Sequence, residues 1–478
     1  MDWPYIYNVI FYDIPISGIE KQSDMVKIIT YNYILPMLIF GVLLLYGISK
    51  LIINHQYVLN KISTNQINFV ESWNSGINKI SKFKKTDKFF TFFWLLGPFI
   101  FLIERDPADL WISSFALIFL FKCYKNNYWS WITNSWFKFA LIFWVICIIS
   151  SINSPYFSHS IKDAIFWIRF PLYAVAAQFW IGKDKDVRIM MYFSVLIGSL
   201  ILSSFLFFEV LVVPKPRLTF PYGDVIPGTY FARISLPVIL SITFLTLTSK
   251  KDKIILFGSI LSIITLALIL TGERINLLIV ICSINLFILF YLKNLKKVII
   301  FLLVECIFVS FFLFNRLENN SRKDLFFYKN IPLINHNNDN PYWGVWRSGI
   351  QQITVTPILG IGPGATRYNC KNLPYNTPKW LPGKNHCNNH PHNFYIQIFA
   401  ETGIFGFLIG CLLFFKIFSN CYNPKNFTSP ITLASFIVPI AFFFPLQQFG
   451  NFFGQWGNLF IWFGLGLALA SSAKKPTN

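Results

Sequence analysis

The sequence predicts an all-α, polytopic integral membrane protein, a helical bundle of about 12–13 transmembrane helices with one large periplasmic loop. Three observations support this fold class. The 478 residues are 54% hydrophobic and only 13% charged, whereas a soluble domain carries about 25% charged residues. The apolar residues fall in runs of roughly 16–25, the length that crosses a hydrocarbon core about 30 Å thick. The runs lack the alternation of a β-barrel strand, so they predict helices, which satisfy their own backbone groups in lipid.

The predicted spans follow one another along the chain, and each is an apolar run between polar or basic residues. Runs 89–104 and 109–122 are short, so we expect them to be tilted or partly re-entrant. The spans are 31–53, 89–104, 109–122, 136–151, 164–181, 189–213, 229–248, 254–271, 275–292, 298–315, 393–418, 429–449 and 455–473.

Four regions follow from these spans. Residues 1–88 form an extra N-terminal transmembrane helix and a basic connection, and 89–315 form the transmembrane core. Residues 316–392 form a loop outside the membrane, in which "YWGVWRSGIQQI" predicts a short amphipathic helix and "PILGIGPGATRY" predicts a turn built by glycine and proline. Residues 393–478 form the C-terminal helices. An ordered loop of this length is uncommon unless it has a function.

The net charge of +20 is concentrated in short connections between the apolar runs. Lysines crowd 54–88, 249–253, 293–297 and the C-terminal tail, and all these segments fall on one side of the membrane when the spans are counted. Positively charged connections stay in the cytoplasm, so this side is expected to be cytoplasmic and loop 316–392 to face outward. No basic stripe or RNA-binding module is visible, so we expect no nucleic-acid partner.

Arginines at the outward boundary are the first candidates for a binding site. Arg217, Arg274 and Arg347 lie in outward connections, and Arg233 lies inside a predicted span. An arginine in or beside a span is costly and is usually retained for a partner or a transport pathway. Its guanidinium offers paired donors to phosphate oxygens, which suits a lipid pyrophosphate. The alternative is that each arginine pairs with a lipid headgroup or with a nearby carboxylate. For Arg274, the neighbouring Glu273 supplies such a carboxylate.

Histidines crowd the segment "HCNNHPH", directly before an apolar run. Three interpretations are open. His386, Cys387, His390 and His392 are zinc-ligand types, but their spacing matches no usual zinc pattern, so no metal is expected. One histidine is suited to act as a general base, because its pKa lies near neutral pH. Otherwise the histidines cap the helix or are solvated.

Two cysteines share the outward loop. Cys370 and Cys387 are the only cysteines that the predicted topology places in an outward connection. Disulfides belong to oxidising compartments. A bridge that closes a loop of this size stabilises by about 3 kcal/mol in the chain-entropy description. We therefore expect Cys370 and Cys387 to form a disulfide.

Three motifs together resemble the signature of the O-antigen ligase and polymerase superfamily of bacterial envelope proteins. In "HPHNFYIQIFAETGIFG", His392 and Asn393 are followed by nine residues and then Gly403, the spacing of that family. "PILGIGPGATRY" is similar to its upstream "hP-hhGhG" segment, and "LTGERINLL" is similar to its "hTGSR" turn, with Glu273 where serine is common. The resemblance covers roughly residues 89–473.

The resemblance implies a glycosyltransferase of the bacterial inner membrane, with its active site on the periplasmic side. Its donor is a glycan on undecaprenyl pyrophosphate, and its acceptor is a sugar hydroxyl of lipid A-core or another glycan. His392 would be the general base, and Arg274 and Arg347 would hold the pyrophosphate, without metal or cofactor. Further candidates for binding the substrate are Arg217, Arg233, Arg367, His390 and Asn393.

Alternatives to a ligase remain open. A polymerase of the same family transfers the glycan to another lipid-linked repeat unit, and a protein O-oligosaccharyltransferase transfers it to protein. A lipid-binding transporter is a third possibility, in which the arginines only bind lipid phosphate. The His392 signature favours a transferase, because transport needs no base at that position.

Overall fold

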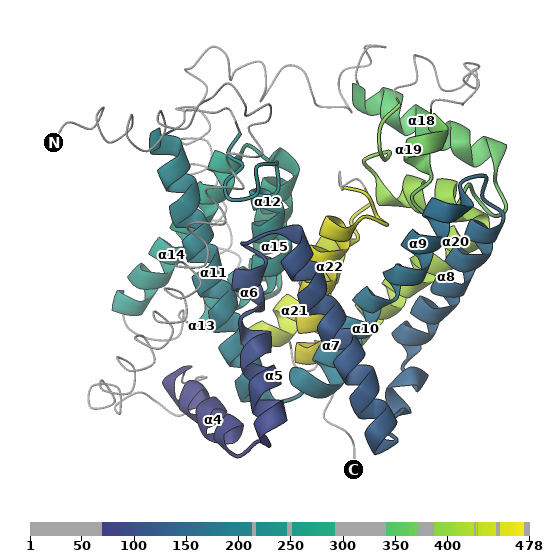
Figure 1. Ribbon diagram of the computed structural model, residues 1–478. Coiled ribbons are helices and arrows are strands. Elements are labelled where there is room, and N and C mark those ends of the chain that lie inside the picture. Colours follow the sequence, from purple (N-terminus) through teal and green to yellow (C-terminus); the bar gives the residue numbers. More distant parts are fainter. Residues whose placement is uncertain are drawn as a thin grey trace, which may run out of the picture.

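The computed structural model describes residues 69–212, 217–245, 251–291, 341–370, 387–424, 427, 429–445 and 450–472. Every secondary-structure element in these residues is an α-, π- or 3-10 helix, and no strand occurs among them. This confirms the all-α prediction (Figure 1). Six of the described helices are long and apolar enough to cross a membrane. The predicted spans 31–53 and 298–315 lie outside the described residues, as does His386.

The first half of the described chain holds α4 (Phe69–Ser81), α5 (Lys85–Leu95), α6 (Gly97–Ile100), α7 (Arg105–Asn126), η2 (Ser130–Thr133), α8 (Ser135–Ile152), α9 (Phe157–Trp167), α10 (Arg169–Ala176), η3 (Ala177–Ile181) and α11 (Lys185–Val212). The second half holds α12 (Pro227–Tyr230), η4 (Phe231–Ser235), α13 (Leu236–Leu245), α14 (Lys251–Thr271), α15 (Arg274–Tyr291), α18 (Pro341–Val355), α19 (Thr366–Asn369), α20 (Phe394–Cys421), α21 (Pro430–Phe442) and α22 (Gln455–Ser472).

The structure changes the predicted boundaries in three places. Run 109–122 is the middle of α7, which has 22 residues and is therefore longer than predicted and long and apolar enough to cross a membrane. Run 89–104 is divided into α5 and the one-turn α6, with Pro98 at the start of α6. The predicted connection 152–163 is largely helical, because α9 begins at Phe157 and continues through α10 and η3 to Ile181.

The long helices are apolar on both their buried and their exposed faces. On α7, Trp111 and Phe115 are buried in the bundle, while Leu110 is 70% exposed and Phe121 is 66% exposed. A water-soluble helix would expose polar residues on its outer face. Large exposed aliphatic and aromatic side chains on a spanning helix are suited to contact lipid, as predicted for this fold class.

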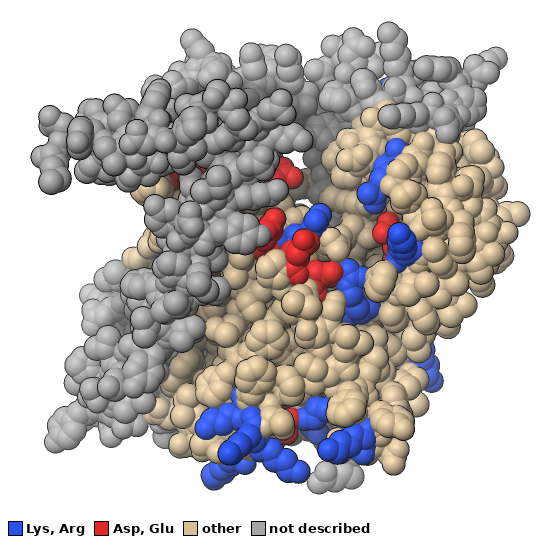
Figure 2. All heavy atoms as spheres, in the orientation of Figure 1, with Lys and Arg blue, Asp and Glu red and all other residues tan. Residues whose placement is uncertain are grey.

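One end of the bundle is basic, and we call it the basic end. The Nζ atom of Lys79 in α4 lies 2.9 Å from the carboxylate of Asp184, directly before α11, and 2.8 Å from that of Asp186, in the first turn of α11. Ser471 at the end of α22 lies 3.1 Å from the hydroxyl of Tyr192 near the start of α11. Figure 2 shows Lys and Arg side chains gathered where α4 and α5 lie. The α4–α5 segment and the C-terminal end of α22 therefore share one end, as predicted, and its cytoplasmic location stays a prediction.

The opposite end, which we call the site end, is held together by side chains from the connections. The hydroxyl of Tyr222 donates to the carbonyl of Phe101 at 2.9 Å, and its ring contacts that of Trp456. Gln397 of α20 donates to Asn451 at 2.5 Å. These contacts join the connections that follow α6, α11 and α21 to the start of α20.

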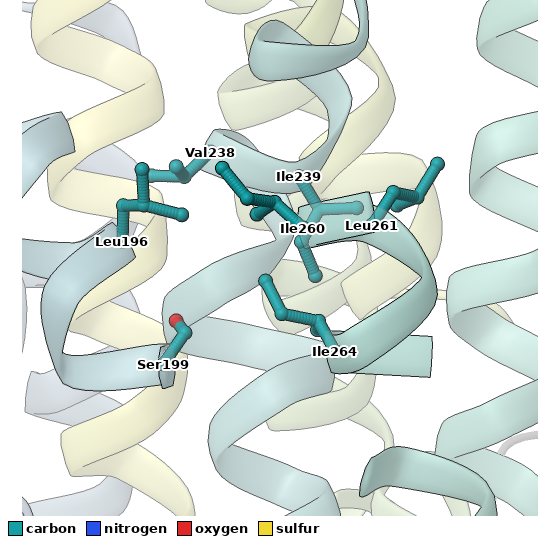
Figure 3. A pocket seen from close by; sticks show the side chains of 7 residues that line it. All are labelled: Leu196, Ser199, Val238, Ile239, Ile260, Leu261 and Ile264. Carbon is teal, nitrogen blue, oxygen red and sulfur yellow. The ribbon is translucent and has the colours of Figure 1, made fainter. Parts of the chain in front are cut away.

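A narrow apolar crevice, with no room for a water molecule, lies within the bundle between α11, α13 and α14 (Figure 3). Six aliphatic side chains and one serine form its lining: Leu196, Ser199, Val238, Ile239, Ile260, Leu261 and Ile264. The Ser199 hydroxyl lies 2.7 Å from the Val195 carbonyl and 2.6 Å from the Ser235 hydroxyl. The described lining therefore carries aliphatic side chains and one hydroxyl that is already hydrogen-bonded.

Helix α20 is broken at Gly403, the glycine of the His-Asn-x9-Gly motif. Gly403 has φ 67° and ψ −169°, a conformation that is essentially open to glycine alone. A Cβ there would collide with the carbonyl of Ile358. The predicted span 393–418 is therefore two helices, and the nine residues of the motif are the helical segment between the cap Asn393 and the break.

We expect Gly403→Ala to destabilise the protein by more than about 1 kcal/mol, because alanine strongly disfavours this φ and its Cβ meets backbone. The melting temperature in detergent would measure the loss. Gly258→Ala is the matched control, since Gly258 lies inside α14 with nothing within 4 Å of its added Cβ. There the substitution should be neutral or stabilising. Equal melting temperatures for the two variants would contradict the role given to Gly403.

Candidate active site

The glycine-rich connection after α18 wraps around the second turn of α20, as the sequence predicted for a turn. Gly360, Gly362 and Gly364 all have positive φ, which lets the backbone turn sharply. The amide of Gly362 donates to the carbonyl of Glu401 at 2.9 Å. From α8, the Ser150 hydroxyl lies 2.7 Å from the same carbonyl, so three segments meet at Glu401.

The carboxylate of Glu401 holds this connection in place. It is fully buried and accepts the backbone amides of Gly364 at 2.8 Å and Thr366 at 3.2 Å. Gln397, one turn earlier in α20, donates to it at 3.1 Å. A buried carboxylate needs several donors to be stable, and here they come from the turn that leads into α19. The sequence analysis did not select Glu401, although a single acid inside an apolar run was the signal.

His392 lies directly before α20 in a left-handed backbone conformation, with φ 53°. Histidine is among the residues that accept this region most often outside glycine. The side-chain nitrogen of Asn388 lies 2.9 Å from Nε2 of His392, a contact that orients the imidazole. The His390 and His392 rings lie 4.3 Å apart, centroid to centroid. Asn388 is a second residue of the site that the sequence analysis did not select.

Burial controls the proton affinity of both histidines. It lowers the pKa of His392 below its ordinary value of 6.5, so the imidazole is neutral at neutral pH. Burial lowers the pKa of His390 to about 3, assisted by the charges of His392 and Arg367. The Nε2 atom of His390 is buried without a hydrogen-bond partner. Both rings are thus kept in the form that accepts a proton or a hydrogen bond.

Asn393 is occupied as the cap of α20. Its side-chain oxygen accepts the amides of Tyr395 at 3.0 Å and Ile396 at 3.2 Å, and its nitrogen donates to the carbonyl of Pro445 at 2.8 Å. An asparagine at this position satisfies amides that a helix start leaves without partners. These contacts give Asn393 a structural role beside the substrate-binding role expected for it.

Helix α18, which carries Arg347, packs on the histidine segment, and its existence confirms the amphipathic helix predicted from "YWGVWRSGIQQI". At Gly349 the two segments are so close that a Cβ would lie 2.6 Å from Ile396 and 3.0 Å from Pro391. Arg347, two residues before this crossing, is only 5% exposed. Burial lowers the pKa of its guanidinium, which still carries its charge at neutral pH.

Arg274 begins α15 at the site end, directly after the turn that contains Glu273. Glu273 accepts the amide of Gly228 at 2.6 Å and the side-chain nitrogen of Asn276 at 2.5 Å. These contacts tie the turn to the start of α12. Burial raises the pKa of Glu273 to about 7, an effect that the Gly228 and Asn276 bonds and the charge of Arg217 oppose. Arg217 therefore belongs to the same corner of the site end.

The raised pKa of Glu273 predicts a pH-dependent stability. The unfolded chain loses this proton near pH 4.5 and the folded chain near pH 7, so the carboxyl should lower stability progressively as pH rises between these values. Glu273→Gln should remove that part of the pH dependence, measured as melting temperature from pH 4.5 to 7.5. Asp106→Asn, at an exposed carboxylate of α7, is the control. A Glu273→Gln curve parallel to that of the unmodified protein would contradict the assignment.

Arg233 approaches the same end from inside the bundle. It is fully buried in η4, with its guanidinium 4.9 Å from the ring of Phe442. The next residue, Phe443, accepts a hydrogen bond of 2.5 Å from the hydroxyl of Tyr395. The end of α21 thus separates Arg233 from the segment that begins at His392. Element η4 also packs on α15, the helix of Arg274.

Arg367 lies in α19, directly after the glycine-rich connection. Its Nε donates to the carbonyl of Gly364 at 3.1 Å, and its guanidinium lies 3.6 Å from Asp163 of α9. The structure joins Cys370 and Cys387 in a disulfide with Cα atoms 5.1 Å apart, which confirms that prediction. The bridge ties α19 to the segment of His392, and it removes Cys387 as a thiolate ligand for zinc.

Comparison with known proteins identifies the part of the chain that carries this site. Residues 257–411 match the O-antigen ligase family. This stretch of the chain is similar to that family. It runs from α14 into α20 and contains Arg274, Arg347, Arg367, His390 and His392.

Two rickettsial proteins are similar to shorter parts of the chain, and both are described as "Putative polysaccharide ligase". The protein of Rickettsia felis is 34% identical over 86 residues, which are 17% of this chain and 20% of that protein. The protein of Rickettsia conorii is 33% identical over 99 residues, 20% of this chain and 23% of that protein. The chain thus spans about a fifth of the length of these relatives.

Proposed function

We propose that the protein transfers a glycan from undecaprenyl pyrophosphate to a sugar hydroxyl of lipid A-core, at the periplasmic face of the bacterial inner membrane. The acceptor oxygen attacks the anomeric carbon of the donor and the bond from that carbon to the pyrophosphate oxygen breaks. The acceptor hydroxyl loses its proton to a base, and the electron pair of the broken bond leaves with the pyrophosphate. No metal takes part.

His392 is the proposed base. Its pKa is lowered by burial, so the imidazole is neutral and able to accept the proton at neutral pH. Asn388 orients the ring through the 2.9 Å contact of its amide with Nε2. With the amide oxygen turned to accept from Nε2–H, Nδ1 is the nitrogen that takes the proton. An orienting partner of this kind is typical of catalytic histidines, because it fixes which nitrogen faces the substrate.

Arg274 and Arg347 are the proposed partners of the pyrophosphate. Fixed guanidinium groups stabilise charge that develops on a leaving phosphate without reorganising during the reaction. Arg217 and Arg233 lie at the same end and would bind the donor around them. His390, whose ring lies 4.3 Å from that of His392, and Arg367, which acts electrostatically on His390, are further candidates for binding the substrate.

The crossing of α18 over the His392 segment is the observation that carries this proposal. Contact at Gly349 places a helix with a buried arginine beside a histidine held neutral by burial. The family match over 257–411 covers both elements and supports a ligase. A pure lipid-binding role would explain the arginine and leave the neutral, oriented histidine without a purpose.

Deletion of the gene tests the proposal in cells. We expect the long glycan bands of the lipopolysaccharide to disappear and the polymer to accumulate on its lipid carrier. A core that still receives a single repeat unit would instead identify a polymerase, and unchanged bands would argue against both.

Transfer by the purified protein should survive a chelator, because arginines neutralise the pyrophosphate. The measurement is the initial rate with lipid-linked donor and core acceptor, with and without EDTA. The control is a second sample to which Mg²⁺ is returned after EDTA. Loss of activity with EDTA and recovery with one specific metal would contradict the proposed metal-free mechanism.

A further inference from the structure

A stack of three aromatic rings lies at the site end, outside the residues already assigned. The Tyr368 ring of α19 stacks on His159 of α9 at 4.6 Å with planes 26° apart, and on Tyr156 at 5.6 Å with planes 28° apart. His159 is exposed and the two tyrosines are half-buried. None of these rings belongs to the hydrophobic core, so packing of the bundle does not account for them.

Polar side chains surround the stack, and their mutual contacts are long. The Tyr368 hydroxyl lies 3.4 Å from Nδ1 of His159, and the Tyr156 hydroxyl lies 3.5 Å from Asn369. A well-formed hydrogen bond from a hydroxyl to oxygen is about 2.7–2.8 Å long. The ion pair at the same edge, between Arg367 and Asp163 (3.6 Å, above), is also long. These polar groups therefore lie together along one edge of the stack, beside the exposed ring of His159.

This combination suits a sugar. A pyranose ring has an apolar C–H face that packs on an aromatic ring, and its hydroxyls both donate and accept hydrogen bonds. Sites for such ligands combine aromatic surface with a few polar groups that fix orientation. The edge of the stack supplies a carboxylate that accepts, a guanidinium that donates, and an amide that does both.

The stack is continuous with the candidate active site. Arg367 is part of its edge and also acts electrostatically on His390, whose ring lies against His392. The Cys370–Cys387 disulfide joins α19, which carries Tyr368, to the histidine segment. A sugar on the stack would therefore be one unit of a chain that extends toward His392.

We propose that Tyr156, His159 and Tyr368, with Asp163, Arg367 and Asn369 at their edge, form a sugar-binding subsite that holds one residue of the glycan substrate near His392. This inference rests on the proposed function for the source of the sugar, which is either the donor or the acceptor glycan. The binding itself is measurable without any transfer.

Direct binding is the first test. The probe is the soluble oligosaccharide released by mild acid from the surface glycan of the source cells, added to the full-length protein in detergent and followed by saturation-transfer NMR and a titration. We expect His159→Ala and Tyr368→Leu to weaken binding roughly tenfold. Lys162→Ala is the matched control, since Lys162 is an exposed residue on the same helix. It should bind like the unmodified protein.

Transfer kinetics are the second test and identify the source of the sugar. His159→Ala should raise KM several-fold for one substrate, either donor or acceptor, and leave kcat within about twofold because the base is intact. His392→Ala should slow transfer by about 10²–10⁴-fold and still bind the oligosaccharide. If neither the unmodified protein nor any variant transfers glycan, but His159→Ala and Tyr368→Leu still bind the oligosaccharide more weakly, the proposed function fails and the subsite stands.

Three results would overturn the subsite. They are the absence of oligosaccharide binding by the unmodified protein, equal binding by His159→Ala, Tyr368→Leu and Lys162→Ala, and a lower kcat with unchanged KM in His159→Ala. Equal binding would leave the rings as an aromatic belt at the membrane boundary. Melting temperatures of all variants show that the comparison is made between folded proteins. Because His159→Ala changes an exposed side chain, this variant is expected to fold.

Discussion

Transfer by His392→Ala should be about 10²–10⁴-fold slower than transfer by the unmodified protein, the usual contribution of a positioned acid–base group. The imidazole is the proposed acceptor of the proton from the attacking hydroxyl, and its burial keeps it neutral. Because His392 has φ 53°, alanine adds a small backbone cost. His392→Asn separates the two effects, since asparagine accepts this conformation readily but supplies no base.

The expected pH profile follows from the direction of the pKa shift. A base works in its neutral form, so kcat/KM should fall as pH decreases through the pKa of His392, which lies below 6.5. Asn389→Ala, an exposed neighbour in the same segment, should keep both the rate and this profile. Near-normal transfer by well-folded His392→Asn would remove His392 from the mechanism.

Replacing Arg347 or Arg274 with lysine should also impair transfer strongly, even though the charge is kept. Lysine is a point donor and cannot form the paired contacts that guanidinium makes with pyrophosphate oxygens. Loss of a single donor to developing charge typically lowers kcat by about 10²–10³-fold. The rate with saturating donor and the affinity for the donor should both be measured.

Arg105→Lys is the matched control for these variants. Arg105 is exposed at the start of α7, at the site end, and pairs with the neighbouring Asp106. Its replacement should leave transfer unchanged. If all three lysine variants transfer at the normal rate, then Arg274 and Arg347 serve only lipid or structural contacts, and the proposed pyrophosphate site is wrong. The family match favours a loss of transfer in the Arg274→Lys and Arg347→Lys variants, because residues 257–411 contain both arginines and exclude Arg105.

The fold class and the order of the helices were predictable because they depend on local quantities. Apolar run length decides whether a segment spans, and the position of lysines between runs decides which connections share an end. The described helices follow that order, and α18 follows from the pattern of "YWGVWRSGIQQI". The disulfide was predictable for a similar reason, since only two cysteines shared the outward loop.

The motif residues were also visible in the sequence, but the reason for their spacing was not. Nine residues between Asn393 and Gly403 form one helical segment, which begins at a cap and ends at a break. The break exists because the Ile358 backbone occupies the place of a Cβ at Gly403. That contact is made by a segment 45 positions earlier in the chain, so no local pattern reports it.

Partners that come from distant segments were decided by the tertiary structure alone. The sequence suggested Arg274 as a partner of Glu273, and only the structure shows that the carboxylate also binds Gly228 and Asn276. In the sequence, Glu401 is a single acid in an apolar run. In the structure, its carboxylate accepts the backbone amides of Gly364 and Thr366. Run length, charge and spacing determined the class of this protein and its candidate residues, because these are properties of the chain. Burial and hydrogen-bond partners decide pKa values and positions, and they exist only after segments far apart in the sequence have packed together.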